Sequence, residues 1–212
     1  MRPDPPFRLT PQSGGPIQQS PVTCGSASLT VARMLVNPAF ARWLVSGVRT
    51  GQKPDPRTEP QRFAEYERVV MRRTNGLVRA GGRLNLPWPR ALGTPPWGAR
   101  AELEHGAATP GVRYQTRLVR LGAPARLRSW YAALVHLVDE GRPALLFVGS
   151  RWLPRHVALV LPGAGDRVLD IYDPATGTVS ELPVQPFADR RLRVAGWDVP
   201  WFVVQPRRRG PE

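Results

Sequence analysis

The sequence predicts an α+β domain, with helices in the first part of the chain and an antiparallel sheet built from the last third. Proline- and glycine-bounded segments with helical spacing fill much of the first 141 residues. The last third instead contains five short runs rich in β-branched and aromatic residues, separated by turn residues. Helices followed by a meander of strands are typical of an α+β domain, so we expect the opening helix to pack against the sheet. The runs are PALLFVGS, RHVALVLPG, RVLDIYDP, GTVSELP and VPWFVVQP.

Four segments have the spacing expected of helices. The first runs from Cys24 to about Val36 without a proline, and Thr23 precedes it as a candidate capping residue. The others are a short helix opened by Pro38 and closed by Gly47, the segment EPQRFAEYERVVMRRT, and the amphipathic segment RLRSWYAALVHLVDEG, which we expect to end at Gly141.

The pattern of turn residues also predicts how the chain is divided. Residues 1–17 read as an extended lead-in and residues 18–206 as a single domain, and 207–212 form a basic tail that includes three consecutive arginines. Within the domain, we expect residues 37–125 to be an insertion of helices and loops. Prolines and glycines crowd residues 75–98, which favours a long ordered loop there.

Composition limits the classes of function. The 212-residue chain is 42% hydrophobic, enough to bury a core, but no apolar stretch is long enough to span a membrane. The first residues lack the layout of a secretory signal, so we expect a cytoplasmic protein. The net charge is +14, yet the arginines are scattered along the chain. Scattered charge indicates a solvated surface, and we do not expect specific nucleic-acid binding.

The single cysteine is either a buried structural thiol or a nucleophile. One cysteine and three histidines exclude an internal disulfide and a cysteine-rich zinc site, and we expect no metal and no cofactor. A thiolate at the first turn of a helix is stabilised by the unpaired amides there. The four residues after Cys24 are all small, so a substrate carbonyl could approach the sulfur. Cys24 is therefore a candidate nucleophile.

An acyl-transfer site also needs two donors for the oxyanion that develops on the carbonyl oxygen. The backbone amide beside Cys24 could be one of them. A side-chain amide could be the other, and Gln18, six residues upstream, is the candidate, with Gln19 as its neighbour.

A hairpin supplies candidates for the base and for the group that orients it. Turn residues around Ala164 and Gly165 separate two β-rich runs, and a register centred on that pair opposes His156 to Asp173. Opposed residues lie on one face about 5 Å apart, which suits an imidazole bonded to a carboxylate. Asp170 has the other parity and should point to the opposite face.

Three pieces of the sequence, QQSPVTCGSASL, RHVALVLP and VLDIYDPATGTVSELPVQPF, resemble the papain-like cysteine peptidase superfamily. Within it they are most similar to the bacteriocin-processing peptidases that cut after a double-glycine leader. The resemblance implies that Gln18 is the oxyanion donor, Cys24 the nucleophile, His156 the base and Asp173 the orienting acid. It covers residues 18–35 and 155–187 and leaves the insertion at 37–125 unmatched.

Three functions follow from these expectations. The first is a cysteine peptidase that cleaves a peptide or isopeptide bond of a protein or peptide substrate through a thioester on Cys24. The second is a related acyl-transfer enzyme, such as a glutamine deamidase or a transglutaminase-like toxin. The third is a basic binding module without chemistry, whose affinity would fall steeply with salt. The oligomeric state is left open.

Overall fold

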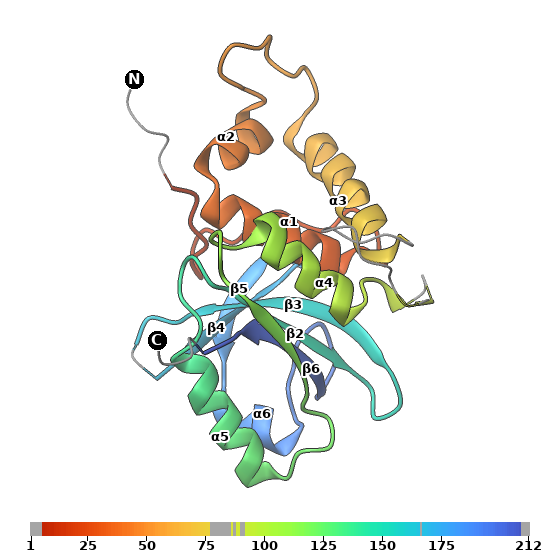
Figure 1. Ribbon diagram of the computed structural model, residues 1–212, viewed down its shortest axis with the longest axis vertical. Coiled ribbons are helices and arrows are strands. Elements are labelled where there is room, and N and C mark those ends of the chain that lie inside the picture. The colour runs from red at the N-terminus through yellow and green to blue at the C-terminus, as the bar shows by residue number, and fades with distance from the viewer. Residues whose placement is uncertain (1–5, 77–85, 87, 90–91, 166, 209–212) are drawn as a thin grey trace.

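The computed structural model describes residues 6–76, 86, 88–89, 92–165 and 167–208, and these residues form three layers. A six-stranded sheet lies in the middle, with α1 to α4 on one face and α5 and α6 on the other (Figure 1). The helices are α1 (Cys24–Val36), α2 (Pro38–Ser46), α3 (Glu59–Asn75), α4 (Pro96–Glu102), α5 (Pro124–Val135) and α6 (Val184–Asp189), with a π-helical turn at Leu103–Ala107 after α4. The strands are β1 (Tyr114–Leu118), β2 (Ala144–Gly149), β3 (Pro154–Pro162), β4 (Leu169–Asp173), β5 (Thr178–Leu182) and β6 (Val199–Pro206).

The sheet is antiparallel throughout and has the order β1-β6-β2-β3-β4-β5. Strands β2 to β5 form the predicted meander of consecutive neighbours. The last strand, β6, returns to lie between β1 and β2. The predicted α+β class is therefore confirmed, and β2 and β3 become central strands.

The two central strands are buried on both faces, which explains their nearly continuous apolar sequences. On one face Phe147 and Leu159 join a core formed with α1, α2, α3 and α4. On the other face Leu146 and Val160 join a second core formed with α5 and α6. Alternate residues of the same strands thus fill two cores, as the pleat of a strand requires.

Helix α1 has its predicted bounds, and α2 begins and ends where Pro38 and Gly47 predicted. In α2 the side chain of Asn37 accepts a hydrogen bond from the Phe40 amide at 2.9 Å, and Gly47 ends the helix in the left-handed conformation at φ 75°. The capping role predicted for Thr23 is wrong, because its hydroxyl donates to the Ser20 carbonyl at 2.9 Å instead.

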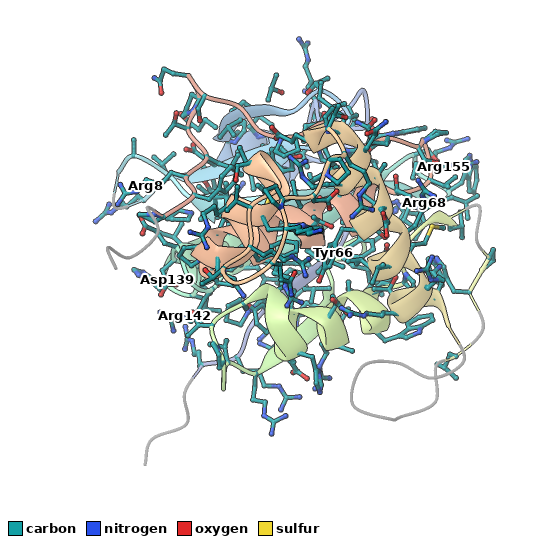
Figure 2. All side chains as sticks on the ribbon, turned by 90° about the horizontal axis from the view of Figure 1, so that it is seen from above. Arg8, Tyr66, Arg68, Asp139, Arg142 and Arg155 are labelled. Carbon is teal, nitrogen blue, oxygen red and sulfur yellow. The ribbon has the colours of Figure 1, made fainter. Side chains whose placement is uncertain are left out.

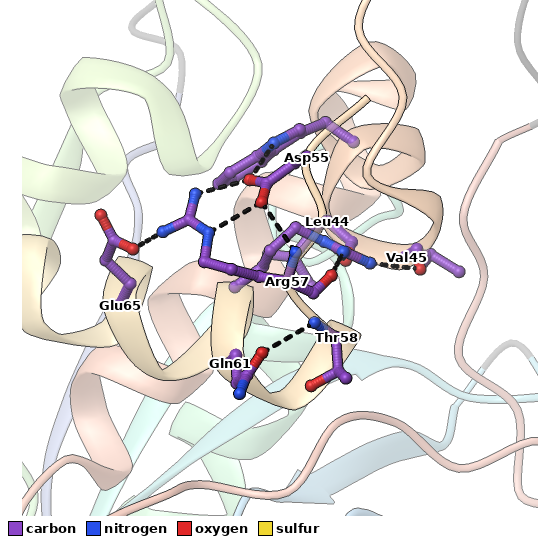
Figure 3. Close-up of polar contacts among 9 residues, drawn as sticks. Leu44, Val45, Asp55, Arg57, Thr58, Gln61 and Glu65 are labelled. Carbon is purple, nitrogen blue, oxygen red and sulfur yellow. Dashed lines mark hydrogen bonds and ion pairs between the residues drawn. The ribbon is translucent and has the colours of Figure 1, made fainter. Parts of the chain in front are cut away.

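A cluster of polar contacts fixes the connection between α2 and α3 (Figure 3). Asp55 accepts hydrogen bonds from the Arg57 side chain and from the Trp43 indole, and Arg57 also pairs with Glu65 on α3. The buried Arg62 donates to the Leu44 carbonyl at 2.8 Å, one of the last carbonyls of α2. Since those carbonyls have no partner within the helix, Arg62 satisfies the end of α2 from α3.

Two predictions for the remaining segments need correction, and one helix was not predicted. Helix α5 ends at Val135 rather than at Gly141, and a bridge between Asp139 and Arg142 follows it. Helix α6 was not predicted, because it is only six residues long, Pro183 precedes it and Pro186 lies within it. Part of the loop predicted at 75–98 lies outside the described residues, and its end is already helical from Pro96.

Candidate active site

Cys24 is the first residue of α1 and is 3% exposed. The helix is attached to the sheet through Ser28, one turn further on, whose hydroxyl donates to the Val157 carbonyl of β3 at 3.2 Å. The N-terminus of α1 is thereby held against the start of the strand that carries His156. The first five residues of α1 are all buried, and the small side chains of the four that follow Cys24 allow this close approach.

The structure brings Cys24, His156 and Asp173 together. His156 lies near the start of β3 and Asp173 is the last residue of β4. The Nε2 atom of His156 is 2.8 Å from Oδ1 of Asp173, and the imidazole also lies against the thiol of Cys24. Since Nε2 is engaged by the carboxylate, Nδ1 is the ring nitrogen left for the sulfur.

The register that suggested this contact is nevertheless wrong by two residues. Leu159 faces Tyr172, whereas the predicted register would place it opposite Asp170. The hairpin closes at the pair Pro162 and Leu169, so its centre lies one residue later than expected. A displacement of two residues leaves every side chain on its original face, and diagonal neighbours remain within reach of a long side chain. The histidine and the aspartate therefore still meet.

A turn after β4 holds the carboxylate of Asp173. Oδ1 accepts a hydrogen bond from the Ala175 amide at 2.9 Å, and the backbone amide of Ala195 supplies another to the side chain. Gly177 closes the turn at φ 72° with a bond from its amide to the Asp173 carbonyl, a conformation that favours glycine. Burial opposes ionisation of the carboxyl group, but the bonds from His156 and from these amides outweigh it and lower the pKa of Asp173.

The same contacts set the charge of the imidazole. Burial alone would lower the pKa of His156, but the hydrogen bond to Asp173 and the contact with Cys24 raise it to about 9. The ring is therefore cationic at pH 7.

The lead-in places Gln18 beside the turn that follows Asp173. The backbone amide of Gln18 donates to the Pro174 carbonyl at 2.8 Å, and the backbone amide of Gly15 donates to the Gly177 carbonyl at 2.7 Å. In the side chain of Gln18, Nε2 donates to the Ser20 carbonyl at 2.9 Å, and Oε1 is buried without a hydrogen-bond partner. Gln18 is thus next to the turn that follows Asp173, and its role as oxyanion donor stays a prediction. The side chain of Gln19 is exposed and donates to Ile17.

Glu67, a buried acid on α3 that the sequence analysis missed, also binds this lead-in. Glu67 on α3 is 1% exposed, and its two oxygens lie 3.1 and 3.4 Å from the Gln19 amide nitrogen, which donates to them. Burial raises the pKa of Glu67 to about 7, although the Gln19 amide, the Thr23 hydroxyl and the charge of Arg68 oppose the rise. Its position between Phe63 and Val70 on the buried face of the helix was a signal in the sequence.

The segment before α4 packs against the N-terminus of α1. A side chain at Gly93 would begin 3.9 Å from the sulfur of Cys24, and the Gly93 carbonyl accepts a hydrogen bond from Asn75 at 2.7 Å. Thr94 is fully buried against Gly25, where an added Cβ would lie 2.6 Å from the Cβ of the threonine. These contacts help to bury the sulfur of Cys24.

The described residues also bear on metal binding and on membrane insertion. In that part of the chain, no group of three or more histidine, cysteine, aspartate or glutamate side chains is placed to hold a metal ion. Every helix among the described residues is too short or too polar to span a bilayer.

Comparison with known proteins gives structural likeness only, and no match by sequence. No protein-family model matches the sequence, and no curated protein matches it. Among solved structures, the chain is similar to the crystal structure of the Pseudomonas avirulence protein AvrPphB, with 15% sequence identity and a TM-score of 0.45. The alignment covers 90% of this chain and 95% of that chain. We therefore base the functional proposal on the residues of the site.

Proposed function

We propose that the chain is a papain-like cysteine hydrolase that cleaves a peptide or isopeptide bond through a thioester on Cys24. The observation that carries the proposal is the buried chain of contacts from the thiol through the imidazole of His156 to Asp173, at the N-terminus of α1. A sulfur, a base and an orienting acid in that order form the arrangement required for nucleophilic catalysis.

Each residue has a role that follows from its contacts. The thiolate of Cys24 attacks the substrate carbonyl carbon, and His156, protonated in the resting site, gives its proton to the departing amine. Water then attacks the thioester and the neutral imidazole of His156 takes the proton from this water, which releases the carboxylic acid product and restores the thiolate and the imidazolium. Asp173 holds the ring through Nε2, so that Nδ1 stays directed at the sulfur. Gln18 and the backbone amide of Cys24 would stabilise the oxyanion.

The resemblance of the three motifs suggests which peptides to test first as substrates. Because the sequence around Cys24, His156 and Asp173 resembles that of peptidases that cut after a double-glycine leader, peptides with Gly-Gly before the scissile bond belong in the first set. The full chain and the Cys24→Ala variant would be incubated with this set and with a digest of a proteome, and new N-termini would be identified by mass spectrometry. New termini that depend on Cys24 support the proposal, and identical peptide patterns from the two proteins would reject it.

The same experiment separates hydrolysis from acyl transfer. A labelled primary amine added in excess competes with water for the thioester, so preferential labelling of the product would identify an acyl-transfer enzyme. Binding without turnover, unaffected by Cys24→Ala and weakened steeply by salt, would instead identify a basic binding module.

A further inference from the structure

A concave region away from the candidate active site lies between α1, α2 and α3, and Arg33, which lines it, is nine residues along α1 from Cys24. Its volume is about 450 Å³. Among the described residues that line it there is no aspartate or glutamate, whereas four arginines from four parts of the chain line it. Arg33 belongs to α1, Arg42 to α2, Arg73 to α3 and Arg49 to the loop between α2 and α3.

Aromatic rings hold two of these guanidinium groups in place. The Cζ atom of Arg33 lies 5.0 Å from the ring centre of Phe40 and 5.6 Å from that of Tyr66, which is labelled near the middle of the helical layer in Figure 2. The Cζ atom of Arg49 lies 4.0 Å from the ring centre of Trp43. A guanidinium stacked on a ring keeps its N–H groups free to bind in its own plane. The buried Nε of Arg33 has no hydrogen-bond partner.

In the part of the chain that the structure describes, two of the arginines that line this cavity, Arg33 and Arg49, form no ion pair. Arg73 pairs with Glu102 at 3.2 Å. The nearby Asp55 is already engaged by Arg57 and by the Trp43 indole, so it does not neutralise the cavity. Like charges gathered in a partly buried space repel one another, and an anion bound among them would relieve that repulsion.

We propose that this cavity binds a compact polyphosphate or a small phosphorylated molecule. The guanidinium groups cover faces of the aromatic rings, so the cavity offers charge and hydrogen-bond donors in place of an apolar slot. The forked donors of arginine match the oxygens of a phosphoryl group, and several such groups on one molecule could be bound from several sides. The volume lies within the range of small-molecule sites. This site is independent of the chemistry at Cys24.

The test is calorimetric titration of the full chain with inorganic tripolyphosphate at constant ionic strength. We expect one molecule to bind per chain, and Arg33→Gln to weaken it at least tenfold. Arg128→Gln removes the same charge from an exposed position on α5, outside the cavity, and should change the affinity less than threefold. Equal weakening by the two variants, or binding at several equivalent sites, would mean that tripolyphosphate responds only to the general positive charge and would overturn the proposal.

Two further measurements address folding and ligand chemistry. Ala39 is exposed at the second position of α2 and lines the cavity, so Ala39→Glu adds a carboxylate without removing any contact. An acidic residue is favourable near a helix N-terminus, so this variant should fold. It should bind tripolyphosphate at least tenfold more weakly than its neutral counterpart Ala39→Gln, and equal binding would contradict the proposal. Tricarballylate, a tricarboxylate, should bind more weakly than tripolyphosphate, and equal affinity would overturn the assignment to phosphate.

Discussion

Replacing the buried Glu67 by glutamine should change how stability depends on pH. The pKa of this carboxyl group rises from 4.5 to about 7 on folding. At about 1.36 kcal/mol per pKa unit, the rise corresponds to about 3 kcal/mol. Because the native state holds this proton more tightly than the unfolded state, the contribution is fully present below pH 4.5 and is lost as pH rises through about 7. Glutamine keeps the acceptor for the Gln19 amide but does not titrate.

Urea unfolding of the wild type and of Glu67→Gln between pH 4.5 and 8 measures this effect directly. The free energy of unfolding of the variant, relative to that of the wild type, should increase over that interval by up to about 3 kcal/mol. Glu140→Gln, at an exposed glutamate, serves as the control and should show no comparable trend. A difference between wild type and Glu67→Gln that stays constant with pH would show that the carboxyl group is solvated, and the account of the buried contact with the lead-in would fail.

Three further predictions concern the site itself. His156→Ala should lower the rate of peptide cleavage by about 100-fold or more, as expected for loss of an acid–base group. Asp173→Asn should lower it less, because the amide oxygen of asparagine can still accept a hydrogen bond from the ring. Initial rates at saturating peptide would rank the two variants. The free energy of unfolding of the wild type relative to His156→Gln should fall by up to about 3 kcal/mol between pH 6.5 and about 9. The reason is that the stabilisation from the raised pKa of His156 is present below pH 6.5 and lost above pH 9. Chemical denaturation of both proteins across that range measures this fall, and a constant difference would contradict the prediction. Gly25→Ala should destabilise the fold by about 1 to 3 kcal/mol, because its Cβ would lie 2.6 Å from that of Thr94, and Thr94→Gly in the same chain should recover much of the loss in thermal unfolding.

Local signals in the sequence were sufficient for much of the fold. Pro38 and Gly47 bound α2 because proline fixes the first turn of a helix and glycine adopts the left-handed conformation that ends it. The β-rich runs predicted β2 to β5 for a similar reason, since turn residues separate them. The contact between His156 and Asp173 was also predictable, because the face of a strand depends only on parity.

Contacts between distant segments were not predictable in the same way. The hairpin register depends on the conformation of its turn, and the sequence does not say where the ladder closes. Glu67 and Thr94 reach the site from helices and loops far along the chain, so no spacing motif connects them with Cys24. For Glu67, an acid on the buried face of a helix was the available signal, and for Thr94 we find none.

Alkylation of the single cysteine tests the proposed thiol–imidazole contact most directly, because intact mass reports modification of Cys24 without interference from another thiol. The folded chain and His156→Ala would be treated with iodoacetamide at pH 6, with the unfolded chain as the reference for an ordinary thiol. If the imidazolium of His156 holds the sulfur as a thiolate, the native chain is modified much faster than His156→Ala at this pH. Equal rates for the two folded proteins, both below that of the unfolded chain, would show a merely buried thiol and contradict the account.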